Sequence, residues 1–308
     1  MRTYGEMSEK IIVPGSSNSR VAYRVARELS IPLADMEIKK FPDGEKYVRI
    51  NCDVVGKHAI IVQSGALKPD EYLIETLLIA DALNDLGSKH VSLVFAYFPY
   101  ARQDERFKPG EAISLVTVTK LLKGVGIKTL ITVDAHRHRV INFERIFGGK
   151  VIDVSAMPYL SSFARSQGLV GEDVIVIGPD VESEGWAKLA AEAINASDYG
   201  ALTKRRISPS EVEVTISKPL NLKGRDVLLV DDIISTGGTM IEAIKLLRKM
   251  DVRSITVACT HGLFVNNALM KILKMNIKAI VSSDTVPNPT TKVSVAPAIA
   301  KAIKELNC

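Results

Sequence analysis

The sequence predicts an α/β protein of two tandem, doubly wound domains with mainly parallel sheets. Short apolar runs rich in β-branched residues recur along the chain, and their lack of polar alternation is typical of strands buried on both faces. Stretches with the apolar spacing of helices separate these runs. A chain of 308 residues is also long enough for two domains with separate cores. Together these features favour parallel strands joined by right-handed helical crossovers.

The elements are expected in a regular order along the chain. Strands are expected at residues 11–14, 59–63, 91–95, 130–133, 174–177, 227–230, 255–258 and 279–281. Helices are expected at residues 18–29, 71–86, 113–122, 184–194 and 239–249. Ser16, Ser17 and Asn18 are residue types that cap helix starts, and Gly87 is a type that ends helices. Residue type therefore marks the start of the first helix and the end of the second.

The strand–helix alternation occurs twice, with a break near residues 148–155. We therefore place an N-terminal domain at residues 1–150 and a C-terminal domain at residues 151–295. The amphipathic segment 296–308 is expected to pack back on the first domain. Residues 204–213 interrupt the second series with a basic stretch that contains Ser and Pro and few apolar side chains. That stretch is predicted to be an exposed, mobile loop.

The composition excludes several classes of protein. Hydrophobic residues make up 46% and charged residues 24%, as in ordinary globular proteins. A net charge of +5 suits the binding of small anions and is too weak to indicate nucleic acid. The three cysteines lack metal-ligand spacing, the N-terminus is polar, and no apolar run approaches the ~20 residues of a membrane helix. We expect a cytoplasmic protein without nucleic-acid or membrane partners.

The sequence VDDIISTGGTM at residues 230–240 carries the clearest chemical signal. Glycines after a parallel strand let the backbone approach an anion, and the amides of the following helix start point at it. The motif lacks Gly-Lys-Ser/Thr and is not a Walker loop. Asp231 and Asp232 would repel a phosphate, so they are expected to face donors such as vicinal sugar hydroxyls. An ordinary turn in which Asp caps the helix is the alternative.

These residues resemble the signature loop of the phosphoribosyltransferase fold family. The resemblance implies a phosphoribosyltransferase-like fold for the two domains. It also implies that Asp231 and Asp232 contact the ribose hydroxyls of a bound sugar phosphate. The 5-phosphate would be held by Ser235, Thr236, Gly237, Gly238 and Thr239.

Further segments extend the resemblance to residues 11–302, and together they are similar to the ribose-phosphate diphosphokinase family. The sequence FPDGE at residues 41–45 is, taken alone, a turn. Residues 102–103 follow a strand, where an arginine can pair with phosphate. The resemblance implies that the 41–45 loop reaches across a subunit interface and that ATP is bound by Phe41, Asp43, Gly44, Glu45, Arg102 and Gln103.

Two other segments concern metal and catalysis. A lone histidine such as His136 is more often structural, and Asp180 could simply cap the helix that follows it, although a carboxylate there suits Mg²⁺. A basic run such as the one at Lys204 is usually a solvated face. The resemblance makes His136 and Asp180 ligands of Mg²⁺. It makes Lys204 and Arg206 catalytic, with Arg206 also binding ribose 5-phosphate.

The implied reaction transfers the diphosphoryl group of ATP to the anomeric hydroxyl of ribose 5-phosphate, in a homo-oligomer that is at least a dimer. A phosphoribosyltransferase that moves a ribosyl group to a nitrogenous base is the alternative enzyme, but it would leave the segments at 41–45 and 102–103 without a role. A non-enzymatic regulator on the same fold is the alternative from another class. Such a paralogue would be expected to lose metal or loop residues, and this chain keeps them.

Overall fold

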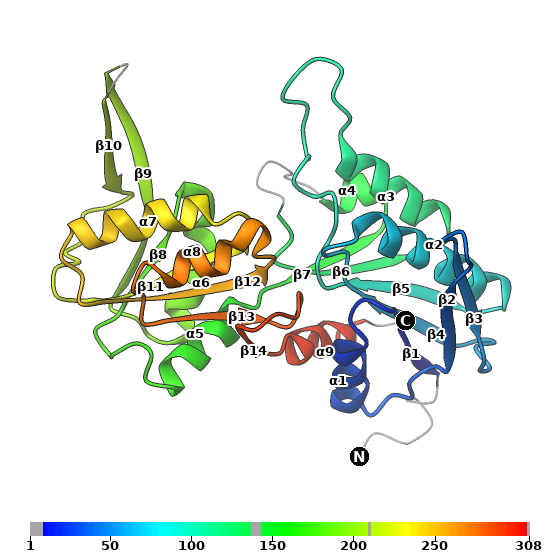
Figure 1. Ribbon diagram of the computed structural model, residues 1–308. Coiled ribbons are helices and arrows are strands. Elements are labelled where there is room, and N and C mark those ends of the chain that lie inside the picture. The colour runs from blue at the N-terminus through cyan, green and yellow to red at the C-terminus, as the bar shows by residue number, and fades with distance from the viewer. Residues whose placement is uncertain (1–8, 137–142, 209–210, 307–308) are drawn as a thin grey trace. The chain divides into compact units, whose positions relative to one another are not determined.

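The structure is a computed structural model of the chain, shown in Figure 1, and it describes residues 9–136, 143–208 and 211–306. The chain divides into two compact units. Unit 1 comprises Met1–Val154 together with Val295–Cys308, and unit 2 comprises Ser155–Ser294. The C-terminal helix α9 (Ala296–Lys304) belongs to unit 1, where it packs on α1 (Ser19–Leu29).

Unit 1 is built on a five-stranded parallel sheet with the order β1-β4-β5-β6-β7. Its strands are β1 (Lys10–Pro14), β4 (His58–Gln63), β5 (His90–Phe95), β6 (Thr129–Val133) and β7 (Lys150–Val154). The helices besides α1 and α9 are α2 (Pro69–Asp85), α3 (Ser114–Gly124) and α4 (Phe143–Phe147). β1, β4, β5 and β6 are largely buried because helices cover the sheet, which explains their continuous apolar runs, whereas the edge strand β7 is half-buried.

A separate antiparallel hairpin of β2 (Met36–Lys40) and β3 (Lys46–Ile50) completes unit 1. The hairpin forms its own two-stranded sheet. Met36, Ile38, Val48 and Ile50 pack its inner face against the apolar core of the unit. The hairpin is therefore attached to the unit by side chains and not by a shared sheet.

Unit 2 is built on a seven-stranded sheet with the order β10-β9-β8-β11-β12-β13-β14. Its strands are β8 (Ile175–Gly178), β9 (Asp198–Ser208), β10 (Glu211–Ile216), β11 (Asp226–Ile234), β12 (Ser254–Gly262), β13 (Ala279–Ser283) and β14 (Thr291–Val293). Its helices are α5 (Met157–Ser166), α6 (Glu184–Ala193), α7 (Gly238–Lys249) and α8 (Ala268–Leu273), with 3₁₀ turns η1 (Val181–Ser183) and η2 (Val265–Asn267). Every pairing in this sheet is parallel except β9 with β10, so the predicted class of mainly parallel α/β sheets is confirmed.

The structure corrects two expectations about the elements. Residues 204–213 were expected to form a mobile loop, but β9 and β10 pair through this region, with Lys204 opposite Val214. An antiparallel edge ribbon satisfies its backbone by cross-strand hydrogen bonds and needs few apolar anchors, so the polar composition was misleading. The break near 148–155 contains β7, which pairs with β6.

None of the helices in the described ranges combines the length and the hydropathy of a bilayer-spanning segment.

Candidate active site

The β11–α7 connection lies at the carboxyl end of a central strand of unit 2, between β8 and β12. β11 is longer than predicted and runs to Ile234, so Asp231 and Asp232 lie within the strand. Asp232 is 1% exposed, whereas Asp231 is half-buried. The Asp232 backbone amide donates to Asp231 Oδ1 at 3.1 Å. The two carboxylates are thus fixed at the edge where ligands of open α/β sheets bind.

The electrostatics of this strand end are unusual for a pair of acids. Burial, followed by the neighbouring carboxylates of Asp232 and Asp180, raises the pKa of Asp231 well above its usual value. Burial also raises the pKa of Cys259, which lies opposite Asp231 in β12, and the charges of Asp231 and Asp232 add to this effect. The Cys259 thiol is therefore a poor nucleophile. Hydroxyl donors or a cation placed here would offset the concentrated negative charge.

The loop after β11 presents a helix start to solvent. Gly237 has φ +79° and is the residue that precedes α7. A Cβ on Gly237 would lie 3.2 Å from side-chain atoms of Ala268 and Ile272 in α8, so both its conformation and its surroundings favour glycine. Thr236, Gly238 and Thr239 are exposed, and Ser235 is half-buried. Exposed amides and hydroxyls at a helix start form an anion-binding concavity.

Asp180 lies at the carboxyl end of β8, next to β11 in the sheet. Its Oδ1 accepts from the Ser183 amide at 3.2 Å and caps the 3₁₀ turn η1. The helix α6, which the capping interpretation concerned, has Ser183 as its N-cap instead. The turn η1 contacts β11, and the Asp180 carboxylate is one of the charges that raise the pKa of Asp231. The structure thus gathers the predicted acids of unit 2 at one end of its sheet.

Lys204 and Arg206 lie in β9, which pairs with β8 on one side and β10 on the other. Their side chains fall outside the described part of the chain, so their catalytic role stays a prediction. Their position in a regular strand replaces the mobile loop that was expected to carry them.

In unit 1, residues 41–45 form the turn between β2 and β3. The Phe41 amide donates to the Glu45 carbonyl at 2.8 Å, and the Gly44 amide donates to the Phe41 carbonyl at 2.9 Å. Gly44 has φ +101°, which a turn of this kind requires. The ring of Phe41 is 46% exposed and meets Tyr47 edge-on, and Asp43 and Glu45 are exposed. An aromatic face and two acceptors are available to a ligand.

Arg102 and Gln103 follow β5 in an irregular segment. Arg102 is exposed, whereas the Gln103 amide donates at 3.2 Å both to the Glu105 carbonyl and to Glu111 Oε2. Glu111 also accepts from the backbone amides of Phe107 and Lys108 at 3.0 and 2.9 Å. Glu111 therefore orders this segment, a role that sequence reasoning missed because its partners are irregular backbone.

His136 follows β6 in unit 1 and is half-buried. Asp134 before it has φ +41°, and its amide donates to the Val154 carbonyl at 2.8 Å. Asp153 of β7 accepts from the Thr132 hydroxyl at 2.7 Å and from the Ala135 amide at 3.2 Å, which fixes the start of the His136 segment. Sequence reasoning missed Asp153, whose role depends on the pairing of β7 with β6.

Metal binding by His136 and Asp180 stays a prediction, because the two residues lie in different units. Within the described ranges, no group of three or more His, Cys, Asp or Glu side chains could hold a metal ion. Mg²⁺ usually takes one or two protein ligands and completes its shell with substrate phosphates and water. The donor set available here fits that mode of binding.

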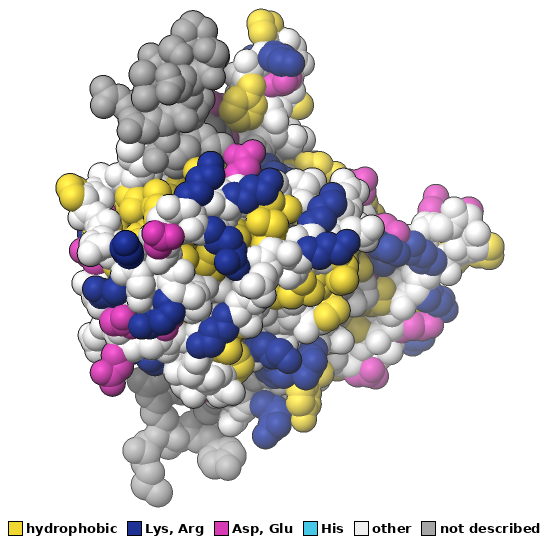
Figure 2. All heavy atoms as spheres, turned by 60° about the vertical axis from the view of Figure 1, so that its left-hand side comes forward, with side chains coloured by type: hydrophobic (Ala, Val, Ile, Leu, Met, Phe, Trp, Pro, Cys, Tyr) yellow, Lys and Arg dark blue, Asp and Glu magenta, His cyan; other side chains and the backbone are white. Residues whose placement is uncertain are grey.

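Figure 2 shows Lys and Arg side chains spread over one face among apolar and acidic ones, so basic charge is not gathered into one stripe there.

Comparison with known proteins agrees with this geometry. A family model described as the N-terminal domain of ribose phosphate pyrophosphokinase matches residues 10–126, and a phosphoribosyl transferase domain model matches residues 159–287. The chain is 37% identical over 296 residues to the ribose-phosphate pyrophosphokinase of Methanothermobacter thermautotrophicus, covering 96% of this chain and 100% of that protein. It is 40% identical over 270 residues to the enzyme of that name from Pyrococcus furiosus, covering 87% and 92%.

A solved structure extends the comparison to the whole fold. The crystal structure of phosphoribosylpyrophosphate synthetase from Mycobacterium smegmatis matches with a TM-score of 0.84 and 27% identity over 96% of this chain and 98% of that one. The fold and the β11–α7 loop define a protein of the phosphoribosyltransferase class. More narrowly, the full-length matches show that the chain belongs to the ribose-phosphate pyrophosphokinase family.

Proposed function

We infer that the chain makes 5-phosphoribosyl 1-diphosphate from ATP and ribose 5-phosphate, as an enzyme of nucleotide biosynthesis. The observation that carries this conclusion is the full-length match to ribose-phosphate pyrophosphokinases at 37% identity, with both family models in order. The chain transfers the diphosphoryl group to the anomeric hydroxyl and releases AMP.

Unit 2 binds ribose 5-phosphate in this proposal. Asp231 and Asp232 accept hydrogen bonds from the ribose hydroxyls, which offset the burial and the repulsion that raise the pKa of Asp231. The 5-phosphate lies against the exposed helix start, with donors from Ser235, Thr236, Gly237, Gly238 and Thr239. Charge supports assigning the sugar to the aspartates and the phosphate to the glycine-containing loop, because a phosphate beside the two aspartates would be repelled.

Unit 1 binds ATP. The exposed ring of Phe41 stacks on adenine, and Asp43 and Glu45 accept hydrogen bonds from its exocyclic amino group, with Gly44 shaping the turn. Arg102 pairs with phosphate. Gln103 gives up its hydrogen bond to Glu111 and forms one with the nucleotide instead. The chain forms a homo-oligomer of at least two copies, because the 41–45 loop of the family acts across a subunit interface.

The reaction needs no covalent intermediate. The anomeric hydroxyl of the bound sugar attacks the β-phosphorus of ATP in line, and the chain contributes positioning and charge. Lys204 and Arg206 offset the negative charge that develops on the transferring group. His136 and Asp180, together with substrate phosphates, would hold Mg²⁺, which would supply further charge neutralisation.

The test is ATP consumption in the presence and absence of ribose 5-phosphate, with AMP and the sugar diphosphate measured by chromatography. AMP formation that requires ribose 5-phosphate and a divalent cation is the expected result. Release of pyrophosphate from 5-phosphoribosyl 1-diphosphate on addition of a purine or pyrimidine base, without ATP-dependent AMP formation, would instead identify a phosphoribosyltransferase.

A further inference from the structure

The β2–β3 hairpin that carries residues 41–45 is tied to α2 by a buried ion pair at the base of its turn. Lys46 is the first residue of β3 and lies opposite Lys40, the last residue of β2. Lys46 Nζ lies 2.7 Å from Glu75 Oε2, and the two side chains are 10% and 0% exposed. The pair therefore lies one residue from Glu45.

Glu75 belongs to a buried polar cluster that joins four segments of unit 1. Its carboxylate accepts from the Ser16 amide at 2.7 Å, from the Ser16 hydroxyl at 2.6 Å and from Gln63 Nε2 at 2.8 Å. Burial alone would raise the pKa of Glu75, but the hydrogen bonds from Lys46, Ser16 and Gln63 together hold it below its usual value. Glu75 is thus an ionised anchor fixed by the carboxyl ends of β1 and β4.

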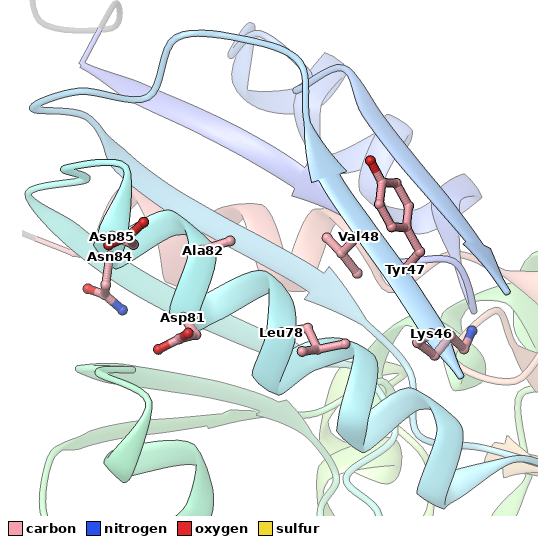
Figure 3. Close-up of a pocket in the computed structure, with 8 residues that line it drawn as sticks. All are labelled: Lys46, Tyr47, Val48, Leu78, Asp81, Ala82, Asn84 and Asp85. Carbon is pink, nitrogen blue, oxygen red and sulfur yellow. The ribbon is translucent and has the colours of Figure 1, made fainter. Parts of the chain in front are cut away.

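Apart from this ion pair, the hairpin is held by the apolar packing of its inner face and borders an open groove. A groove of about 590 Å³ lies between β3 and the second half of α2, lined by Lys46, Tyr47 and Val48 on one side and by side chains of α2 from Leu78 to Asp85 on the other. Figure 3 shows β3 contributing one wall of this groove and α2 the other, with Lys46 at one end. Lys46 Nζ also lies 3.8 Å from Glu71 Oε2, and a further charged link to α2, Lys40–Glu71 at 2.9 Å, joins side chains that are 43% and 33% exposed. A surface pair of that kind constrains orientation weakly.

We propose that Glu75, acting through Lys46, is a positioning residue for ATP that sets the orientation of the turn carrying Phe41, Asp43 and Glu45. Neither residue touches the nucleotide, because both side chains are buried. The hairpin shares no sheet with the unit, so side-chain links decide its angle. Binding adenine between a ring and two acceptors tolerates little misplacement. This inference rests on the proposed role of residues 41–45 in binding ATP.

Lys46→Met is the sharper variant. It keeps the length and apolar stem of the side chain and leaves Glu75 with its three donors from Ser16 and Gln63. Glu75→Gln is the complementary variant. Its side-chain NH₂ group would face donors from which the carboxylate accepted hydrogen bonds. In both, we expect the KM for ATP to rise by about tenfold, with kcat and the KM for ribose 5-phosphate within about twofold of the wild type.

Ser92→Ala is the matched control for loss of stability. Ser92 is fully buried in the same unit and bonds His58 at 2.8 Å, at the end of the sheet opposite the polar cluster. We expect this variant to lower the thermal midpoint without changing the KM for ATP. Hydrogen exchange of the Phe41 and Gly44 amides should accelerate in Lys46→Met and stay unchanged in Ser92→Ala.

Phe41→Ala separates this inference from the proposed function. If Phe41→Ala raises the KM for ATP while Lys46→Met and Glu75→Gln leave it unchanged, the positioning role is wrong and the ATP site stands. If Phe41→Ala also leaves the KM for ATP unchanged, both the role of the turn and the inference built on it are overturned. If Ser92→Ala raises the KM for ATP as much as Lys46→Met does, the rise reflects a general loss of stability, and the positioning role of the ion pair is wrong.

Discussion

The Asp153 carboxylate of β7 accepts a hydrogen bond from the Thr132 hydroxyl of β6 at 2.7 Å. The same Oδ1 accepts from the Ala135 amide at 3.2 Å, next to His136. Asp153 therefore fixes the backbone from which the proposed metal-binding imidazole projects.

We expect Asp153→Ala to weaken the response of the enzyme to magnesium. Groups that orient a metal ligand typically change metal affinity by ~10–100-fold when removed, so the Mg²⁺ concentration for half-maximal activity should rise by about tenfold or more. Thr132→Val is the milder control, because it leaves the bond from the Ala135 amide in place. An unchanged magnesium titration in a folded Asp153→Ala enzyme would separate Asp153 from the metal site.

Lys204→Ala is expected to cut turnover severely. Losing one charge aimed at the transferring group costs on the order of 3–4 kcal/mol, or ~10²–10³ in kcat, while the KM for ribose 5-phosphate changes little. Steady-state kinetics measures both quantities. Lys223→Ala, at an exposed lysine of the same unit, should behave as the wild type. Wild-type turnover in Lys204→Ala would remove this residue from the mechanism.

Gly237→Ala is expected to raise the KM for ribose 5-phosphate and leave the KM for ATP unchanged. A side chain at φ +79° costs about 1 kcal/mol or more, and the new Cβ would press on Ala268 and Ile272 at 3.2 Å, which displaces the helix start. Gly224→Ala is the matched control. Gly224 has φ +69° and open space around it, so its variant carries the backbone strain without the displacement. Equal KM changes in the two variants would contradict the phosphate-binding role of the loop.

His58 is expected to make the protein sensitive to acid. Burial, followed by the charges of His90 and Lys10, lowers the pKa of His58 from 6.5 to about 3 in the folded state. The unfolded chain therefore binds a proton that the folded chain excludes, and this stability is lost as the pH falls from about 6.5 to about 3. At pH 4.5 the loss from this residue is roughly 2–3 kcal/mol.

The measurement is urea unfolding at pH 7 and pH 4.5. His58→Gln, which can still reach the Ser92 hydroxyl, should show a smaller drop in the free energy of unfolding between the two conditions than the wild type. The same drop in both proteins would assign the acid sensitivity to other groups.

The sequence was sufficient where the signal is local. The apolar strands of both units were predicted, and Asp180 and His136 were placed beyond the ends of strands, where the structure has them. Asp231 was also placed beyond a strand, but β11 continues past it to Ile234. Polar and edge elements were missed, namely β2, β7, β9, β10 and β14. Edge strands are half-solvated and pair with only one neighbour or with a polar partner, so they lack the apolar run that marks a central strand.

By itself, the sequence determined the α/β class and the succession of strand, aspartates, glycine-containing loop and helix in the phosphate motif, because residue type and spacing along the chain encode them. Only the tertiary structure decided which distant residues support those motifs. Glu75 meets Ser16 across 59 positions, Lys46 across 29, and Asp153 meets Thr132 across 21. The physical reason is that strand order in a sheet, and the packing of helices and the hairpin against it, bring such partners within 3 Å of one another, whatever their distance along the chain.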